Sequence, residues 1–477
     1  MQMIIGGRKT NSSDNRFMES VNPATNDVLG TYPCATKEDV ERALECALTG
    51  KKVWGEMSFN SRADILRKAA DIFEKHVDEL AELQCREMGR PFASCIGEAM
   101  EPASHLRSSV AAGTHMLGEV YPNKDAGGSL GDLAMSLIEP LGVVVCIVPF
   151  NFPVGTLSFK VAPALAAGNA VIIKAPSDAC LTVLRYTEIL LEAGFPDNVV
   201  QVISGPGGTI GDWLVDTDKV NAISFTGSTE IGVGILRKSA RYLHKTILEL
   251  GGNDPLIICE DALDRMDYAV DQAMTRTFNA GQICCINKRF LVHNSIKPKF
   301  IKMLTESLSG LKIGNPLDPE VDMGPCISEK AAKTIESQVN QTISQGARLI
   351  YGGRRDGAFY YPAVIDDVTR DMDIAKDMEV FGPVFPVIGF DSDEEAIEIA
   401  NQTSYGLNGG IISGDIIRGI RIALKIEAGT VVTNGSSQWR RDIAPFGGYK
   451  MSGMGREGIK DLMEEFTQKK TIVIKGI

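Results

Sequence analysis

The sequence has 477 residues, of which 44% are hydrophobic and 23% charged, a composition typical of folded globular proteins rather than disordered or fibrous ones. This length exceeds what a single hydrophobic core usually supports, so we expect two domains, with room for a smaller third element. The formal net charge of −12 argues against a nucleic-acid partner, because a phosphate backbone is held mainly by clustered Lys and Arg.

The cysteines and the apolar segments indicate the compartment. The chain has ten cysteines, and none forms the Cys-x-x-Cys pair that is common in zinc sites, so we expect neither a disulfide framework nor a metal site. The N-terminus has no apolar stretch as long as a signal-peptide core, and the apolar run 143–150 is too short to cross a bilayer. We therefore expect a cytoplasmic protein with no membrane partner.

Helix signals dominate the first quarter of the chain. Thr36 and Asp39 have the spacing of a capping box, and an apolar stripe that recurs every three or four residues follows them. A second stripe runs through 61–88 and stops at Gly89, two residues before Pro91. These patterns predict that the N-terminal quarter is largely helical.

Beyond Gly142 the sequence changes to short, continuous apolar runs rich in β-branched residues. Such runs suit strands covered on both faces of a parallel sheet. They are 143–148, 170–173, 199–203, 222–225 and 256–258. Helix-like stretches such as 181–193 lie between several of them, which predicts a doubly wound α/β fold. A second α/β region follows Gly252 and runs to about residue 432, before a glycine-rich loop at 445–455.

Cys284 is the first candidate for chemistry. It ends the segment Phe278-Asn-Ala-Gly-Gln-Ile-Cys284, where a glycine turn would leave backbone NH groups free to meet an oxyanion. Taken alone this signal is weak, because a free cysteine is among the most often buried residue types and is usually inert. Other segments must support a catalytic assignment.

Three segments supply that support. Glu249 lies in Leu248-Glu-Leu-Gly-Gly252, where burial among apolar neighbours would raise its pKa toward that of a general base. Asn151 follows a predicted central strand, the edge at which open α/β sheets present ligands. Phe225-Thr-Gly-Ser-Thr-Glu-Ile-Gly232 has the order of a strand end, a glycine and a helix start that binds phosphate. In this segment Ser228 also fits a plain helix N-cap.

These segments, with Asp377-Met-Glu-Val-Phe-Gly-Pro383 and Pro445-Phe-Gly-Gly-Tyr-Lys-Met-Ser-Gly453, closely resemble the aldehyde dehydrogenase superfamily. The resemblance runs from about Asn22 to the end of the chain in the family's order, and is similar to the branch that acts on lactaldehyde and semialdehydes. Five separate motifs make it specific, whereas the dinucleotide motif Gly-x-Gly-x-x-Gly is absent.

The resemblance implies a three-part α/β subunit. A Rossmann-type cofactor domain would comprise 1–120 and 140–249, and an α/β catalytic domain would comprise 250–455. A small β oligomerisation element would comprise 121–139 and 456–477. Family members usually assemble as dimers or tetramers, so a homodimer or homotetramer is expected.

The resemblance also implies roles for five residues. Cys284 would attack the aldehyde carbonyl, with the oxyanion held by the Asn151 amide and the Cys284 backbone NH. Hydride transfer to the nicotinamide would give a thioester, which water activated by Glu249 would hydrolyse. Lys160 and Glu457 match a pair that some relatives use to move protons, although a structural salt bridge would explain them equally well.

The implied cofactor is NAD or NADP. The family's cofactor contacts fall on Pro149, Phe150, Lys174, Ser177, Gly207, Thr226, Gly227, Ser228, Leu250, Glu379 and Phe381. Many NAD-preferring relatives have a glutamate at the Ser177 position, where its charge repels a 2′-phosphate. The neutral Ser177 beside Lys174 therefore favours NADP, preferred or shared, unless Asp178 turns inward and restores the charge.

The implied substrate is a small polar or acidic aldehyde. The family's substrate tunnel falls on Thr156, Phe159, Ile283, Cys285, Arg440 and Phe446. Arg440 replaces an aromatic residue found in relatives that take apolar aldehydes, so its guanidinium would hold an anionic or hydroxyl group. The alternative is a salt bridge between Arg440 or Arg441 and Asp442. Cys285 would pack behind the nucleophile or protect it by oxidation.

Two rival functions stay open on the sequence. An acylating dehydrogenase of the same fold would pass the acyl group to coenzyme A, but such relatives usually lack the glutamate at the Glu249 position. A non-catalytic binding protein would not need Cys284, Glu249 and Asn151 together. The five histidines lie in no recognised catalytic motif.

Overall fold

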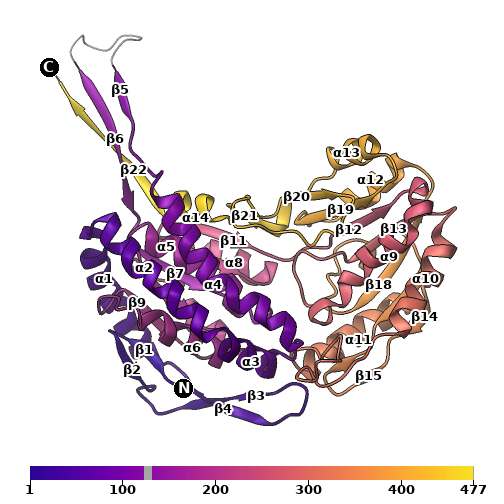
Figure 1. Ribbon diagram of the computed structural model, residues 1–477, viewed down its shortest axis with the longest axis horizontal. Helices are drawn as coiled ribbons and strands as arrows, with labels where there is room; N and C mark the ends of the chain where they lie inside the picture. The colour runs from indigo at the N-terminus through magenta and orange to yellow at the C-terminus, as the bar shows by residue number, and fades with distance from the viewer. Residues whose placement is uncertain (123–131, 476–477) are drawn as a thin grey trace.

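The computed structural model describes residues 1–122 and 132–475, which form two α/β bodies and a projecting arm (Figure 1). The two bodies lie side by side, and the arm leaves the first body and carries the C-terminus (Figure 1). Within the described residues, no helix is both long and apolar enough to cross a membrane. The α/β class predicted from the sequence is confirmed.

The first body is built on an eight-stranded sheet whose five central strands are parallel. In spatial order its strands are β2 (Arg8–Thr10), β1 (Met3–Ile5), β9 (Val200–Ile203), β8 (Ala170–Lys174), β7 (Val143–Ile147), β10 (Ala222–Thr226), β11 (Lys245–Glu249) and β21 (Gly453–Met454). Alternate residues of β7 enter different cores: Val144 packs with one cluster and Val143 with the other. Both faces of the sheet are therefore covered, as the continuous apolar runs predicted.

Helices cover this sheet on both sides. They are α1 (Lys37–Glu56), α2 (Phe59–Phe73), α3 (Val77–Met88), α4 (Phe92–Gly113), α5 (Pro153–Ala166), α6 (Cys180–Leu191), α7 (Gly207–Val215) and α8 (Thr229–Ser239). The capping box predicted at Thr36 and Asp39 is present at the start of α1. The predicted helical stretch 61–88 is divided by a 3-10 turn at Glu74–His76 and ends at Gly89, whose φ of 77° is left-handed. A short hairpin, β3 (Phe17–Val21) and β4 (Val28–Pro33), lies along the same body.

The second body contains a seven-stranded sheet that is parallel except for β14. Its strands are β14 (Arg348–Gly352), β17 (Ala363–Val368), β18 (Val384–Phe390), β13 (Arg289–His293), β12 (Pro255–Ile258), β19 (Asn408–Ile412) and β20 (Thr430–Thr433). Its helices are α9 (Met266–Met274), α10 (Lys297–Ser309), α11 (Glu329–Ser344), α12 (Asp393–Asn401) and α13 (Ile416–Ala423). A two-residue pair, β15 (Arg355–Asp356) and β16 (Phe359–Tyr360), lies beside α11.

The arm is a three-stranded antiparallel sheet of β5 (Val120–Pro122), β6 (Leu133–Pro140) and β22 (Thr467–Ile474). The predicted oligomerisation element covers these strands, and its residues 123–131 and 476–477 lie outside the described part of the chain. Helix α14 (Ile459–Glu465) precedes β22 and buries Leu462 and Met463 in the core of the first body. Strand β21, inside the predicted catalytic domain, pairs with β11 of the first sheet, so this loop joins the two bodies.

Candidate active site

A cavity of about 550 Å³ opens where the parallel strands of the first sheet end. Glu249 is the last residue of β11 and Thr226 the last residue of β10, while Asn151 follows β7 by four residues. These three strands are neighbours in the sheet, so their carboxyl ends meet at one edge. The second body closes the cavity with Cys284, which brings the four predicted motifs together.

The loop before Cys284 has an unusual backbone. Asn279, Ala280 and Gly281 all have positive φ, at 49°, 49° and 74°. A Cβ on Gly281 would overlap the Gly382 backbone, so only glycine fits there. The loop is fixed to the Asn151 segment, because Asn279 Nδ2 donates to the Asn151 carbonyl at 3.1 Å.

The Asn151 side chain is buried and directed at the same loop. Its Nδ2 donates to the Gln282 carbonyl at 2.9 Å. An amide NH₂ group carries two hydrogens, so the second remains available to an oxygen in the cavity. This arrangement is the one an oxyanion donor beside Cys284 requires.

The Cys284 thiol is protonated at rest. Its pKa lies well above the ordinary value, because the neighbouring Cys285 thiol and then burial disfavour the thiolate, while Lys288 opposes them. Lys288 is buried; its Nζ donates to the Cys284 carbonyl and pairs with Glu379 Oε1 at 3.1 Å. Attack by Cys284 therefore needs a group that removes the thiol proton.

Glu249 is the group placed to do so. It is 1% exposed, it interacts with the Cys284 side chain, and its Oε1 has no hydrogen-bond partner within the described residues. Burial first, and then the charge of Cys284, raise the pKa of Glu249 well above its ordinary value. A buried carboxyl with a raised pKa and one free oxygen is suited to accepting and releasing protons.

Lys160 and Glu457 form a buried ion pair behind the cavity. Lys160 Nζ also donates to Ser224 Oγ at 3.1 Å, and Glu457 Oε2 accepts from Arg440 Nη2 at 2.7 Å. Burial opposes ionisation of Glu457, yet the Lys160 and Arg440 charges hold its pKa below the usual range. The salt bridge considered for this pair is present, and its proton-transfer role stays a prediction.

Arg440 lies in the cavity wall, between two aromatic rings. Its guanidinium carbon is 4.1 Å from the Phe159 ring centre and 4.6 Å from that of Phe446. The alternative salt bridge with Asp442 is wrong: Arg440 pairs with Glu457, while Asp442 pairs with His105 Nε2 at 3.4 Å. Arg440 Nε has no hydrogen-bond partner among the described residues. The cavity therefore contains a fixed cation with donor capacity to spare.

The other half of the cavity fits a nicotinamide dinucleotide. Ser228 is the N-cap residue of α8, as expected, but its side chain makes no capping hydrogen bond. Thr226 Oγ1 is buried and lacks a partner within the described chain. Hydroxyls that face a helix N-terminus without partners suit the phosphates and riboses of such a ligand.

The remaining predicted cofactor residues fall into two groups. Those that line the cavity are Pro149, Phe150, Gly227, Leu250, Glu379 and Phe381. Lys174, Ser177 and Gly207 lie outside its lining, at the ends of β8 and β9. Lys174 is 3% exposed, its Nζ makes no hydrogen bond to the described residues, and burial lowers its pKa to about 8. Asp178 is exposed and forms no ion pair with Lys174.

The predicted substrate residues Thr156, Phe159, Ile283 and Cys285 line the opposite half. Phe446 lies beneath Arg440 rather than in the lining. The sequence interpretation missed nine lining residues: Glu101, His105, Phe152, Gly155, Gly251, Gln438, Trp439, Arg441 and Asp442. A signal existed for the first two, because Glu98, Glu101 and His105 follow the i, i+3, i+7 spacing of one helix face.

No group of His, Cys, Asp and Glu in residues 1–122 and 132–475 is arranged to hold a metal ion. The α/β fold, the thiol beside a carboxyl, and the unpartnered Thr226 hydroxyl at the N-terminus of α8 are the features of an oxidoreductase that uses a nicotinamide cofactor. Comparison with known proteins identifies its family.

The model of the aldehyde dehydrogenase family matches residues 9–472. The 3-sulfolactaldehyde dehydrogenase of Priestia aryabhattai is 36% identical, over 96% of this chain and 94% of that protein. The lactaldehyde dehydrogenase of Methanococcus aeolicus is 35% identical, over 99% of each. The crystal structure of betaine aldehyde dehydrogenase from Staphylococcus aureus in complex with NAD⁺ superposes with a TM-score of 0.95 at 34% identity, covering 99% of this chain and 95% of that one.

The chain belongs to the aldehyde dehydrogenase family. It is an enzyme that oxidises small aldehydes to carboxylic acids with NAD(P).

Proposed function

We propose that this enzyme oxidises a small aldehyde that carries a hydroxyl or acidic group, and that it uses NADP at least as well as NAD. The observation that carries the proposal is the Arg440 guanidinium, which lines the cavity and is held there between the Phe159 and Phe446 rings. The 3-sulfolactaldehyde and lactaldehyde dehydrogenases among its relatives support this substrate class.

In the first step, Cys284 Sγ attacks the aldehyde carbon and its proton passes to Glu249. The negative charge on the former carbonyl oxygen is met by the free Asn151 N–H and the Cys284 backbone NH. Removing one such preorganised donor costs about 3–4 kcal/mol of transition-state stabilisation. A nicotinamide cofactor held by the Thr226–Ser228 segment and Glu379 would supply the hydride acceptor for this thiohemiacetal, whose oxidation leaves an acyl group on Cys284.

Before the second step, Glu249 releases the proton that it took from Cys284 to solvent. The ionised Glu249 then takes a proton from water, and the water oxygen attacks the thioester carbon. Cys284 leaves as a thiolate and is protonated again, and the carboxylic acid departs. The unpartnered Glu249 oxygen and its raised pKa support this role. Lys160 and Glu457 would carry protons from this region, because Glu457 contributes to the electrostatic field at Glu249.

Arg440 would hold the polar end of the substrate. A guanidinium fixed by aromatic stacking and one carboxylate loses little conformational freedom when it binds a second anion. Its positive charge also disfavours a cationic aldehyde such as betaine aldehyde. An aldehyde with a carboxylate, sulfonate or hydroxyl group is therefore preferred over an apolar one.

Ser177 and Lys174 would admit the 2′-phosphate of NADP. Lys174 is a cation without a hydrogen bond in the described chain, and Ser177, three residues later, contributes no negative charge. A lysine in this state gains a charge-assisted contact from a phosphate. Both features support NADP as a cofactor alongside NAD.

The arm supports a homodimer or homotetramer. Its strands expose large apolar side chains, including Val120, Tyr121, Leu137, Val473 and Ile474, and a three-stranded sheet that stands alone needs a partner to cover them. The ten cysteines are all free, which supports function in the reducing cytoplasm. We also propose the same domain boundaries that the sequence predicts.

The experiment is a panel of short aldehydes assayed with each cofactor by the absorbance of the reduced nicotinamide. Propanal, 2-hydroxypropanal and succinic semialdehyde differ in their polar groups, and betaine aldehyde carries a cation. We expect the highest kcat/KM for the hydroxylated or acidic aldehydes and measurable rates with NADP. Preference for propanal or betaine aldehyde, or acyl-CoA formation when coenzyme A is supplied, would contradict the proposal.

A further inference from the structure

A second carboxyl group faces the cavity from helix α4. Glu101 lines the cavity, and its carboxyl makes no hydrogen bond or ion pair with any described residue. Its Oε2 lies directly over Gly155 of helix α5, where a Cβ would overlap it. The missing side chain at residue 155 therefore leaves the space that the Glu101 carboxyl occupies.

The charged groups around Glu101 already have partners. Glu98 Oε1 accepts from the backbone NH groups of Val154 and Gly155 at 2.8 Å each, and Glu98 Oε2 pairs with Arg90. Asp442 is paired with His105, and Arg440 with Glu457. Among the described carboxyls in this wall of the cavity, Glu101 is the one without a protein partner.

An unpartnered carboxyl is costly unless a ligand or water satisfies it. Burial, and then the charge of Glu98, raise the pKa of Glu101 to about 8, so at neutral pH it is mostly protonated. In that state it both donates and accepts hydrogen bonds. A hydroxyl group has the same dual capacity and suits the carboxyl in either protonation state.

We propose that Glu101 is a specificity residue that hydrogen-bonds a hydroxyl group on the carbon chain of the aldehyde. The inference rests on the proposed function and refines it: Arg440 takes an anionic terminus, and Glu101 recognises the hydroxyl. An aldehyde that lacks the hydroxyl leaves the carboxyl desolvated and unsatisfied. A site that hydrogen-bonds a substrate hydroxyl rejects the analogue without that hydroxyl more strongly than an apolar pocket rejects a substrate with one methylene more or fewer.

The test compares 2-hydroxypropanal with propanal, which differ only in one hydroxyl. The quantity measured is the ratio of their kcat/KM values, in which effects common to both substrates cancel. In Glu101→Leu we expect this ratio to fall about tenfold or more, mainly through loss with 2-hydroxypropanal. Glu101→Gln, which retains donor and acceptor atoms, should keep most of the ratio.

Two further variants make the test specific. Gly155→Ala places a methyl group where the carboxyl lies, so it should lower the ratio although Glu101 is intact. Glu306→Leu, at an exposed position of α10 remote from the cavity, should leave the ratio unchanged. Thermal unfolding of each variant shows whether it is folded.

Two outcomes overturn the inference. Wild-type enzyme could oxidise both aldehydes equally well, which removes the hydroxyl preference but leaves the proposed oxidation intact. Glu101→Leu could leave the ratio unchanged, and an equal fall of both kcat/KM values would then indicate a structural role only. Failure of wild-type enzyme on every aldehyde with either cofactor would instead refute the proposed function.

Discussion

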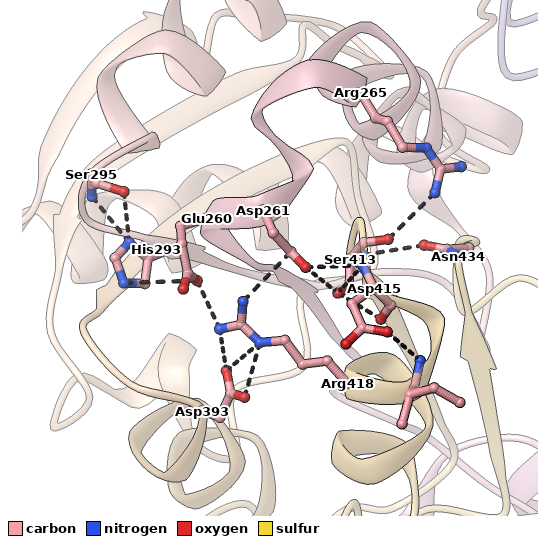
Figure 2. A network of polar contacts seen from close by, with 11 residues as sticks. Glu260, Asp261, Arg265, His293, Ser295, Asp393, Ser413, Asp415, Arg418 and Asn434 are labelled. Carbon is pink, nitrogen blue, oxygen red and sulfur yellow. Dashed lines mark hydrogen bonds and ion pairs between the residues drawn. The ribbon is translucent and has the colours of Figure 1, made fainter.

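Two arginines of this protein lie in clusters of carboxylates. The two clusters differ in whether the atoms that lack a hydrogen-bond partner lie beside the cavity. The Arg418 cluster joins α12, α13 and the 3-10 turn Glu260–Arg265 (Figure 2). Arg418 donates to Asp393 at 2.6 Å and to Glu260 at 2.7 Å, and it lies 3.6 Å from Asp261. The Arg440 cluster instead lines a cavity, with the Nε of its arginine free.

The difference separates a structural network from a binding site. In the Arg418 cluster, Asp261 Oδ2 accepts from Ser413 Oγ and from the Asp415 backbone NH (Figure 2). Asp261 Oδ1 has no hydrogen-bond partner in the described chain, but it lies 3.6 Å from the Arg418 guanidinium and does not line the cavity. Around Arg440, Glu249 and Glu101 both line the cavity, and Glu249 Oε1 has no hydrogen-bond partner among the described residues. Composition alone does not distinguish the two clusters, whereas unsatisfied hydrogen-bonding capacity beside a cavity does.

The largest effect is expected at the nucleophile. Cys284→Ala should lower kcat for aldehyde oxidation at least about a thousandfold, because no neighbouring group replaces the covalent step. Steady-state kinetics with both cofactors measures it, and Cys46→Ala, at a free cysteine remote from the cavity, is the matched control. Substantial turnover by Cys284→Ala would show that the cavity does not work through this thiol.

The next largest effect is expected from substitution of Glu249. Glu249→Gln should slow thioester hydrolysis by about 10²–10⁴. Only ionised Glu249 acts as a base, so wild-type hydrolysis should rise with pH through a pKa above the ordinary glutamate value. Glu249→Gln should lose this limb of the pH profile. An unaltered pH profile with full turnover would exclude Glu249 as the base.

A substitution at Arg440 tests whether this arginine binds substrate rather than only stabilising the fold as Arg418 does. Arg440→Met retains contact with the Phe159 and Phe446 rings but removes the charge, so kcat/KM for succinic semialdehyde should fall about 10–100-fold. Propanal is the internal control, and its kcat/KM should fall much less. An equal loss with both aldehydes would make Arg440 structural, like Arg418.

A smaller effect is expected from substitution of Ser177, in the cofactor-binding region, on the preference for NADP over NAD. Ser177→Glu places a negative charge near Lys174, so the ratio of kcat/KM for NADP over NAD should fall about tenfold. Ser177→Ala, which removes the hydroxyl without adding charge, should change the ratio little. A ratio unchanged in Ser177→Glu would show that the 2′-phosphate lies elsewhere.

Arg418 should affect stability but not catalysis. Arg418→Met should lower the free energy of unfolding by about 1–2 kcal/mol and Tm by a few degrees, with kcat/KM unchanged. Because Arg418 lowers the pKa of Glu260, this stabilisation is present above the ordinary carboxyl pKa and should be lost as the pH falls below it. A loss of activity in Arg418→Met without a loss of stability would contradict the structural role of Arg418.

The sequence predicted the parts of this account that depend on neighbouring residues. Apolar runs predicted β7, β8, β9 and β10 of the first sheet and β12 of the second. Local motifs identified Cys284, Glu249 and Asn151, because each motif lies where a strand or turn ends. The partner of Arg440 was missed, since Asp442 is closer in the chain while Glu457 is closer in space. Glu101 was missed because its role depends on how α4 packs against α5 and on the space left at Gly155.

The most direct test of the account traps the covalent intermediate. Glu249→Gln enzyme is mixed with 2-hydroxypropanal and NADP at alkaline pH, where solvent base removes the Cys284 proton in place of Glu249. It should then acylate slowly, hydrolyse more slowly still, and accumulate an acyl-enzyme, which mass spectrometry of the digested protein detects as an added acyl mass. The account predicts this mass on the peptide fragment that carries Cys284, and its absence when Cys284 is also replaced by alanine. Reduced cofactor formed without any acylated peptide, or acylation at Cys285 alone, would contradict it.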